Sequence, residues 1–174
     1  MQIDTYSQEF SGWFSSPAIR QQIMSGVELV RKSKRIFFIG NGGSNSICSH
    51  MMEDFAKVGR FPTFAFSDPS LITCYANDYG YENAMKEWLK IHFTATDLLI
   101  AISSSGESKN ILNAVGYASS VSQMVLTLSG FKKDNTLSKT GAINFQLPVS
   151  NYGMVECFHQ VILHLILDIL VDTK

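Results

Sequence analysis

Two stretches decide the fold of this chain: RIFFIGNGGS at residues 35–44 and LLIAISSSGES at residues 98–108. Each starts with an apolar run of strand length and ends in small polar residues, and a segment with helical spacing follows each of them. Three further apolar runs stand between helix-like segments: TFAFS at 63–67, MVLTLS at 124–129 and INFQLP at 143–148. Short apolar runs separated by helices are typical of a parallel sheet that is covered on both faces.

This alternation predicts the element order. We expect helices near residues 44–58, 81–92, 107–119 and 133–139, and a strongly apolar last helix over roughly 154–171. Helices are also expected before residue 35, with Pro17 in the first turn of the second one. The expected fold class is α/β: a three-layer, doubly wound, five-stranded parallel sheet of the flavodoxin-like kind with N-terminal helices. In such a sheet the ligand binds at the carboxyl ends of the strands.

Length and charge limit the class of protein. The 174 residues fit a single domain, which we expect to comprise N-terminal helices over 1–34 and an α/β core over 35–174. Charged residues make up 17% of the chain, below the roughly 25% of ordinary soluble domains. This favours either a compact core or a surface that is partly buried in an oligomer. The net charge of −1, with no basic cluster beyond residues 31–35, disfavours nucleic acid as a partner.

The sequence also indicates a cytoplasmic location without a membrane partner. The first ten residues, MQIDTYSQEF, are too polar for a signal peptide. The apolar run 161–171 is interrupted by His164 and Asp168 and is shorter than the roughly 18 residues of a membrane span. The three cysteines fit no metal-ligand spacing, and we interpret them as reduced, mostly buried thiols.

The first polar loop has the composition of an anion-binding site. Its glycines let the backbone approach a ligand closely, and the helix that follows offers unpaired N–H groups at its N-terminus. The side chains of Asn41 and Ser44 add hydrogen-bonding groups to the backbone of Gly42 and Gly43. The loop lacks the glycine spacing of a dinucleotide fingerprint and the lysine of a phosphate-binding P-loop, so no nucleotide cofactor is expected.

The second polar loop is rich in hydroxyl groups. Four serines stand before the next helix: Ser103, Ser104, Ser105 and Ser108. One of them is needed as a helix N-cap, and Lys109 is the only cation nearby, so an anion would be held by dipoles and hydroxyls. One such loop would more often be structural, but two of them at one sheet edge favour a phosphate or sugar site.

Two helices carry side chains that suit acid–base chemistry or a metal. His50 and Asp54 are one turn apart on the helix after the first loop, and Glu156, Gln160 and His164 repeat that spacing on the last helix. A histidine paired with a carboxylate can bind a divalent metal or transfer a proton. The alternative for His50 and Asp54 is a hydrogen-bonded surface pair.

For three further residues the sequence allows both a structural role and a role in the site. His159 lies one residue off the line of Glu156 and His164, so it either belongs to the core or lines the site. Asn77 and Asp78 precede Gly80 in a cluster that is typical of a turn, and they also suit hydrogen bonding to a polyol.

Together these stretches resemble the phosphoheptose isomerase (sedoheptulose 7-phosphate isomerase) branch of the sugar isomerase, or SIS, domain family. The matching stretches are GNGGS with His50 six residues after its serine, ANDYG at 76–80, ISSSGES at 102–108 and ECFHQVILH at 156–164. They follow the family's order from residue 35 to the C-terminus. Each stretch alone is weak, but as a set they are specific.

The resemblance implies a function for each matching position. The implied substrate-binding residues are Asn41, Gly42, Gly43, Ser44, Asn77, Asp78, Ser103, Ser104, Ser105, Ser108 and Glu156. We assign Asp54 as the catalytic base and His164 as the acid, and the alternative or additional role is a Zn²⁺ ion held by His50, Asp54, Glu156 and His164. The sequence departs from the better-known heptose isomerases at two positions: Asp54 replaces a glutamate and Glu156 replaces a glutamine.

The resemblance further implies an aldose–ketose isomerase that forms a homotetramer and takes part in heptose biosynthesis. The expected reaction converts sedoheptulose 7-phosphate into D-glycero-D-manno-heptose 7-phosphate. Two alternatives are an isomerase of another phosphosugar and a non-catalytic sugar-phosphate-binding regulator, like the relatives that associate with the replication initiator. The enzyme is favoured because a regulator would not need Asp54 or His164.

Overall fold

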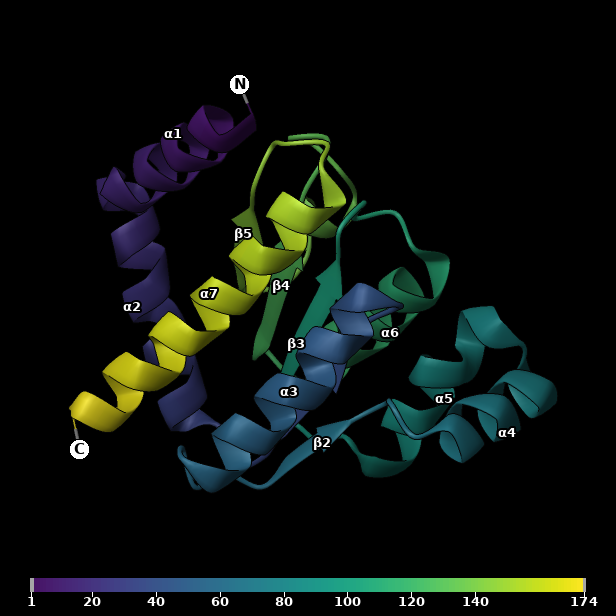
Figure 1. Cartoon of the computed structure of the whole chain (residues 1–174). Coiled ribbons are helices and arrows are strands. Elements are labelled where there is room, and N and C mark those ends of the chain that lie inside the picture. Colours follow the sequence, from purple (N-terminus) through teal and green to yellow (C-terminus); the bar gives the residue numbers. More distant parts are fainter. Residues whose placement is uncertain (1, 174) are drawn as a thin grey trace.

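The computed structural model describes residues 2–173 and confirms the three-layer α/β fold (Figure 1). Its five strands form one parallel sheet in the order β2-β1-β3-β4-β5. The strands are β1 (Ile36–Ile39), β2 (Thr63–Ala65), β3 (Leu98–Ser103), β4 (Val125–Ser129) and β5 (Ile143–Gln146). Each of the five predicted apolar runs therefore contains one strand. Met1 and Lys174, which the single-domain prediction includes, lie outside the described residues.

The helices are close to those expected from the sequence. They are α1 (Gln2–Ser15), α2 (Pro17–Lys32), α3 (Gly43–Lys57), α4 (Pro69–Tyr79), α5 (Tyr81–His92), α6 (Lys109–Val121) and α7 (Tyr152–Asp172). The helix predicted at 133–139 is only a short 3-10 turn, η1 (Leu137–Lys139). The side chain of Asn135 donates to the Lys132 carbonyl and accepts from the Ser138 N–H, and this local bonding competes with a longer helix.

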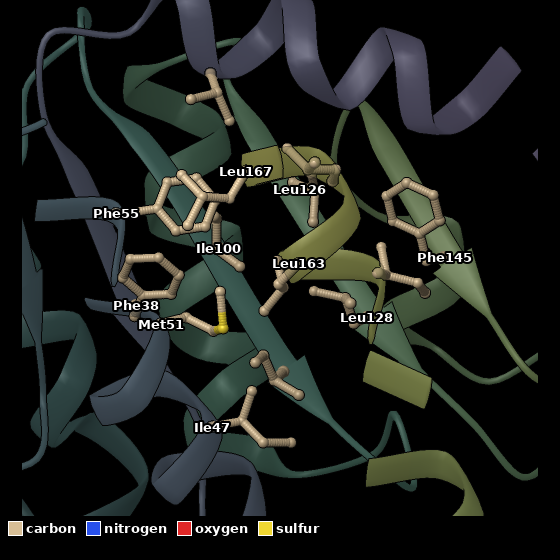
Figure 2. Close-up of a cluster of buried hydrophobic side chains, with 14 of the residues drawn as sticks. Phe38, Ile47, Met51, Phe55, Ile100, Leu126, Leu128, Phe145, Leu163 and Leu167 are labelled. Atoms are coloured by element: carbon tan, nitrogen blue, oxygen red, sulfur yellow. The ribbon is translucent and has the colours of Figure 1, made fainter. Parts of the chain in front are cut away.

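Alternate residues of each central strand enter two separate cores. Phe38, Ile100 and Leu126 point to the face covered by α2, α3 and α7, whereas Phe37 and Leu99 point to the face covered by α5 and α6. The first core is drawn in Figure 2, where side chains of α3 and α7 meet those of the strands. Because both faces are covered, the strands read as continuous apolar runs in the sequence.

Helix α7 is the longest apolar element within residues 2–173. Its length and composition would allow it to cross a membrane, with a mean hydropathy of 1.8, although the apolar run at 161–171 alone was too short. Half of this stretch is buried inside the fold, and core helices of globular proteins pass the same test. Its buried residues pack in the core that it shares with α2, α3 and the sheet. We therefore describe α7 as a core helix.

The prediction of mostly buried thiols is wrong for two of the three cysteines. Cys48 is fully buried in the first core, and burial raises the pKa of its thiol. Cys74 on α4 and Cys157 on α7 are exposed.

Helices α3 and α7 lie side by side on one face of the sheet (Figure 1). The first residue of α3 lies close to α7. A Cβ atom placed on Gly43 would lie 2.5 Å from both carboxylate oxygens of Glu156 on α7. Glycine at this position therefore permits the carboxylate to lie against the start of α3.

Candidate active site

The strand order creates a crevice between β1 and β3. The chain leaves β1 for β2 at one edge of the sheet and then returns to β3 on the other side of β1. The connections after β1 and β3 therefore run to opposite faces of the sheet, and the carboxyl ends of these two strands are the expected ligand site of a doubly wound fold. The two polar loops found in the sequence follow these two strands.

Both loops line one pocket of about 250 Å³. Its lining residues are Asn41, Gly42, Gly43, Ser44, Ser103, Ser104, Ser105, Ser108, Tyr152 and Glu156. Nine of these ten are predicted substrate-binding residues, and the structure brings them together from three separate parts of the chain. Helices α3 and α6 begin at this pocket, so backbone N–H groups of two helix N-termini are available to an anion there.

The serine loop leaves one buried hydroxyl without a protein partner. The Ser103 hydroxyl donates to the Ser108 hydroxyl at 3.2 Å, and the Ser105 hydroxyl accepts from the Glu107 N–H at 3.2 Å. Among the described residues nothing bonds to the buried Ser104 Oγ. Ser108 stands at the N-cap of α6, yet its side chain makes no capping bond. A bound oxyanion would satisfy these groups, because buried polar atoms normally have partners.

Residues 135 and 136, in the segment after β4, contact the serine loop and stabilise it. The Thr136 N–H and hydroxyl both donate to the Glu107 carboxylate at 2.8 Å, which holds the pKa of that carboxyl below its usual range. Gly106 has a positive φ of 68°, and a Cβ atom there would overlap the side chain of Asn135. These contacts within the protein hold the serine loop in its conformation.

The pocket continues along the groove between α3 and α7. Gly43 and Glu156 also line a second hollow of about 360 Å³. Its other lining residues are Ser46, Ile47, His50, Cys157 and Gln160. Glu156 thus lies between the serine loop and the histidine of α3.

Further along this groove, three predicted residues form one cluster. His50 Nε2 lies 3.1 Å from Asp54 Oδ2, and His164 Nδ1 lies 3.8 Å from the same oxygen. The two imidazole rings meet edge to face, with centroids 5.3 Å apart. The amide of Gln160 is 3.5 Å from His164 Nε2. His50 and Asp54 therefore do lie together as a pair, as the sequence allowed, but the pair is in ion-pair contact and faces a histidine from the other end of the chain.

The cluster fits a divalent metal. One ligand atom from each of His50, Asp54 and His164 lies within 4.8 Å of the others. Two imidazoles and a carboxylate are a common donor set for catalytic zinc, which keeps an open position for water or substrate. Glu156, the fourth predicted ligand, is not part of this group and lies against Gly43 instead.

Two predicted substrate residues and one open candidate lie elsewhere. Asn77 and Asp78 are exposed in the last turn of α4, where Asn77 Nδ2 donates to Asp78 Oδ1, and neither lines the two hollows. His159 is fully buried, with Nε2 3.1 Å from the Ser129 carbonyl oxygen. It belongs to the core because its side chain is fully buried and lines neither hollow.

Tyr152 is the pocket residue that the sequence analysis missed. It is the first residue of α7, the residue is 61% exposed, and its ring packs edge to face on Phe131 with centroids 4.7 Å apart. The missed signal was Asn151, a good N-cap residue whose side chain accepts from the Met154 N–H. Asn151 as a cap predicts a last helix that starts two residues earlier, at Tyr152, and the structure places this residue in the pocket.

Comparison with known proteins agrees with this geometry. The family model of the SIS domain matches residues 15–130, so the chain belongs to the SIS domain family. Within that family its relatives place it in the phosphoheptose isomerase branch. The phosphoheptose isomerase of Fusobacterium nucleatum is 35% identical over 144 residues, which cover 79% of this chain and 73% of that protein.

Solved structures share the fold over nearly the whole chain. A phosphoheptose isomerase from Francisella tularensis is 26% identical with a TM-score of 0.85, over 99% of this chain and 95% of that one. The phosphoheptose isomerase from Neisseria gonorrhoeae has a TM-score of 0.88 over 99% of this chain and 96% of its own, and at 21% identity it supports the fold alone.

Proposed function

We propose that this chain is an aldose–ketose isomerase that converts sedoheptulose 7-phosphate into D-glycero-D-manno-heptose 7-phosphate. The observation that carries the proposal is a continuous polar path. It runs from the serine loop past Glu156 to the cluster of His50, Asp54 and His164. One end of this path suits a phosphate and the other end suits proton transfer.

The phosphate is proposed to bind at the serine loop. Ser104 offers a free hydroxyl, Ser103 and Ser108 lie beside it, and the N-terminus of α6 adds backbone N–H groups. The sugar chain would then extend along the groove between α3 and α7. Glu156 lies on this route, and its carboxylate would accept hydrogen bonds from sugar hydroxyls.

The reaction needs one group that moves a carbon-bound proton and one that moves an oxygen-bound proton. The Asp54 carboxylate is proposed to remove the C1 proton of the ketose, which gives a cis-enediol, and to return a proton to C2. His164 would donate a proton to the O2 oxygen and take the proton from O1. His50, in contact with Asp54 at 3.1 Å, would orient the carboxylate.

Zinc is proposed as the cofactor, held by His50, Asp54 and His164, with Glu156 as a fourth ligand that would have to turn towards them. When bound, the ion would polarise the neighbouring carbonyl and hydroxyl oxygens of the sugar. The support is the donor set and the mutual distance of at most 4.8 Å. Zinc content measured on the purified protein should fall in His50→Ala, and competition with a chelator should give a weaker affinity in that variant.

The first alternative is an isomerase of another phosphosugar. Asp54 is one methylene shorter than the glutamate of the better-known heptose isomerases, and a misplacement of about 1 Å can cost roughly 10² in rate. Asp54→Glu tests this alternative: a large gain in heptose isomerase activity would indicate that the chain acts on a different sugar.

The second alternative is a regulator that binds a sugar phosphate without turning it over. The cluster of His50, Asp54 and His164 argues against this, because binding alone needs only the loops. The test of all three functions is one panel assay. Purified protein is mixed with pentulose, hexulose and heptulose phosphates, and aldose formation is followed with and without a chelator. Turnover of the seven-carbon ketose supports the proposal, and binding without turnover of any ketose supports the regulator.

The proposal includes a homotetramer of this one domain in the cytoplasm. The self-association is supported by an apolar groove of about 350 Å³ between the N-terminal helices and α7. The groove is lined by Phe14, Arg20, Ile23, Met24, Leu165 and Ile169. Apolar helix faces of this kind commonly pack against other helices in a bundle.

A further inference from the structure

Most of the hydrogen-bonding groups of the Asn41 side chain are used by other residues of the protein. Its Oδ1 accepts from the Tyr81 hydroxyl at 2.8 Å and from Asn110 Nδ2 at 2.8 Å, and its Nδ2 donates to Asn110 Oδ1 at 3.0 Å. A primary amide offers two acceptor sites and two donor hydrogens. Three of these four are therefore in use, and one N–H of Asn41 remains for the pocket.

The two partners come from elements that the sequence analysis did not connect with the site. Asn110 is in the first turn of α6, directly after the serine loop, and it is only 4% exposed. Tyr81 is the first residue of α5, and the residue is 53% exposed. The amide pair between Asn41 and Asn110 therefore joins the glycine loop after β1 to the helix that follows the serine loop after β3.

We propose that Asn110 and Tyr81 are positioning residues of the sugar-phosphate site. They fix the Asn41 amide in one orientation and hold the glycine loop beside the serine loop. Neither residue lines the pocket, so both act through Asn41. The inference relies on the proposed function only for the identity of the ligand, because the hydrogen bonds are those of the protein alone.

A buried, reciprocal amide pair is suited to this task. An unrestrained asparagine side chain can rotate and exchange its oxygen and nitrogen, which would turn a donor towards the pocket into an acceptor. Asn110 Nδ2 also donates to the Met85 sulfur at 3.7 Å, and because a thioether only accepts, this contact fixes the orientation of Asn110 and, through the reciprocal pair, that of Asn41. The Tyr81 hydroxyl adds a further bond to Asn41 Oδ1 in that orientation. Fixing binding groups before the ligand arrives reduces the ordering cost of binding.

The test is a pair of double-mutant cycles with sedoheptulose 7-phosphate as the substrate. Tyr81→Phe and Asn110→Ala are each made in the wild-type chain and in Asn41→Ala. In the wild-type chain each is expected to raise KM by roughly three- to tenfold, the range of a neutral hydrogen bond, with a smaller effect on kcat. In the Asn41→Ala chain neither is expected to raise KM further, because a residue that acts through Asn41 has no effect once Asn41 is gone.

Tyr79→Phe is the matched control. Tyr79 is also exposed and lies two residues from Tyr81, and its ring contact with Tyr75 survives the change. Its KM should equal that of the wild type. Tyr81→Phe removes only an exposed hydroxyl, so the cycle of Tyr81 with Asn41 gives a result even if Asn110→Ala fails to fold. Equal increases in KM in both backgrounds, or no increase in the wild-type chain, would overturn the inference.

A second readout does not need the reaction. The N–H groups of Asn45 and Ser46 both donate to the Gly42 carbonyl, so their hydrogen exchange reports on the glycine loop. Exchange at these two amides should accelerate in Tyr81→Phe and not in Tyr79→Phe. If the wild type does not turn over sedoheptulose 7-phosphate, the proposed function has failed and this exchange decides the inference alone. Unchanged exchange in Tyr81→Phe would then refute it.

Discussion

At the scale of single residues, two histidines of α7 show how position decides chemistry. His164 lies 3.8 Å from Asp54 at the groove, whereas His159 is fully buried on the inner face of the helix. Burial lowers the pKa of His159 to about 4, and the hydrogen bond to the Ser129 carbonyl only partly offsets this. His159 is therefore neutral in the folded protein at pH values where an unfolded chain would protonate it.

This difference predicts a pH-dependent stability. The pKa of His159 is about 4 in the fold and about 6.5 when unfolded, so the unfolded state binds more protons between these values and stability falls as the pH drops. The contribution of this one residue corresponds to a loss of about 2 kcal/mol between pH 7.5 and pH 5. Urea unfolding at both pH values should show a smaller loss in His159→Gln, which keeps a donor for the Ser129 carbonyl. An equal loss in both proteins would contradict the assignment.

Ser104 supplies the clearest single contact for a phosphate. Its buried hydroxyl has no partner in the described part of the chain, so Ser104→Ala should leave the melting temperature nearly unchanged. A hydrogen bond to a charged group contributes about 1.5–3 kcal/mol, so sugar-phosphate binding should weaken roughly 10- to 100-fold. Ser104→Ala combined with Ser105→Ala should weaken it at least as much. Calorimetry measures this, with Ser120→Ala near the end of α6, away from the pocket, as the control, and unchanged affinity in Ser104→Ala would disprove the contact.

At the scale of elements, the site depends on the close approach of α3 and α7. Gly43→Ala would place a methyl group against the Glu156 carboxylate, whose flexible end must then move away. Alanine is favoured over glycine in a helix by about 1 kcal/mol, so the fold itself should tolerate the change. We therefore expect a lower kcat/KM without loss of stability.

Gly116→Ala on α6 is the control for Gly43→Ala, because nothing lies within 4 Å of its added Cβ. It should keep the wild-type kcat/KM. Steady-state kinetics measures kcat/KM of both variants, and thermal unfolding measures their stability. Full activity in Gly43→Ala would mean that the position of Glu156 does not matter for the reaction.

The elements also show what the sequence could and could not predict. The strands and the two binding loops were predictable because apolar runs and polar turns are local signals, and both loops line the same pocket as expected. The end of α4 was not predictable, because Asn77 and Asp78 are residue types typical of a turn. In the structure they lie in the last turn of this helix, outside the lining of the pocket. The grouping of His50 and Asp54 with His164 came only from the family resemblance, because no local pattern shows that residues 110 positions apart meet.

At the scale of the whole molecule, the apolar groove between the N-terminal helices and α7 predicts an oligomer. Met24 lines this groove and is 47% exposed. Met24→Glu should reduce the mass measured by light scattering at micromolar concentration from that of a tetramer. Ile91→Glu, at an exposed residue on the far side of the sheet, should not. A monomeric wild type would rule out the tetramer.

The central claim is that the phosphate pocket and the cluster of His50, Asp54 and His164 act on one sugar. The most direct measurement is NMR of sedoheptulose 7-phosphate with the purified protein, following the aldose product over time. The account predicts formation of the aldose by the wild type and a rate lower by roughly 10²- to 10⁴-fold in Asp54→Asn and in His164→Ala, with substrate affinity largely retained. No aldose from the wild type, or a full rate in Asp54→Asn, would contradict it.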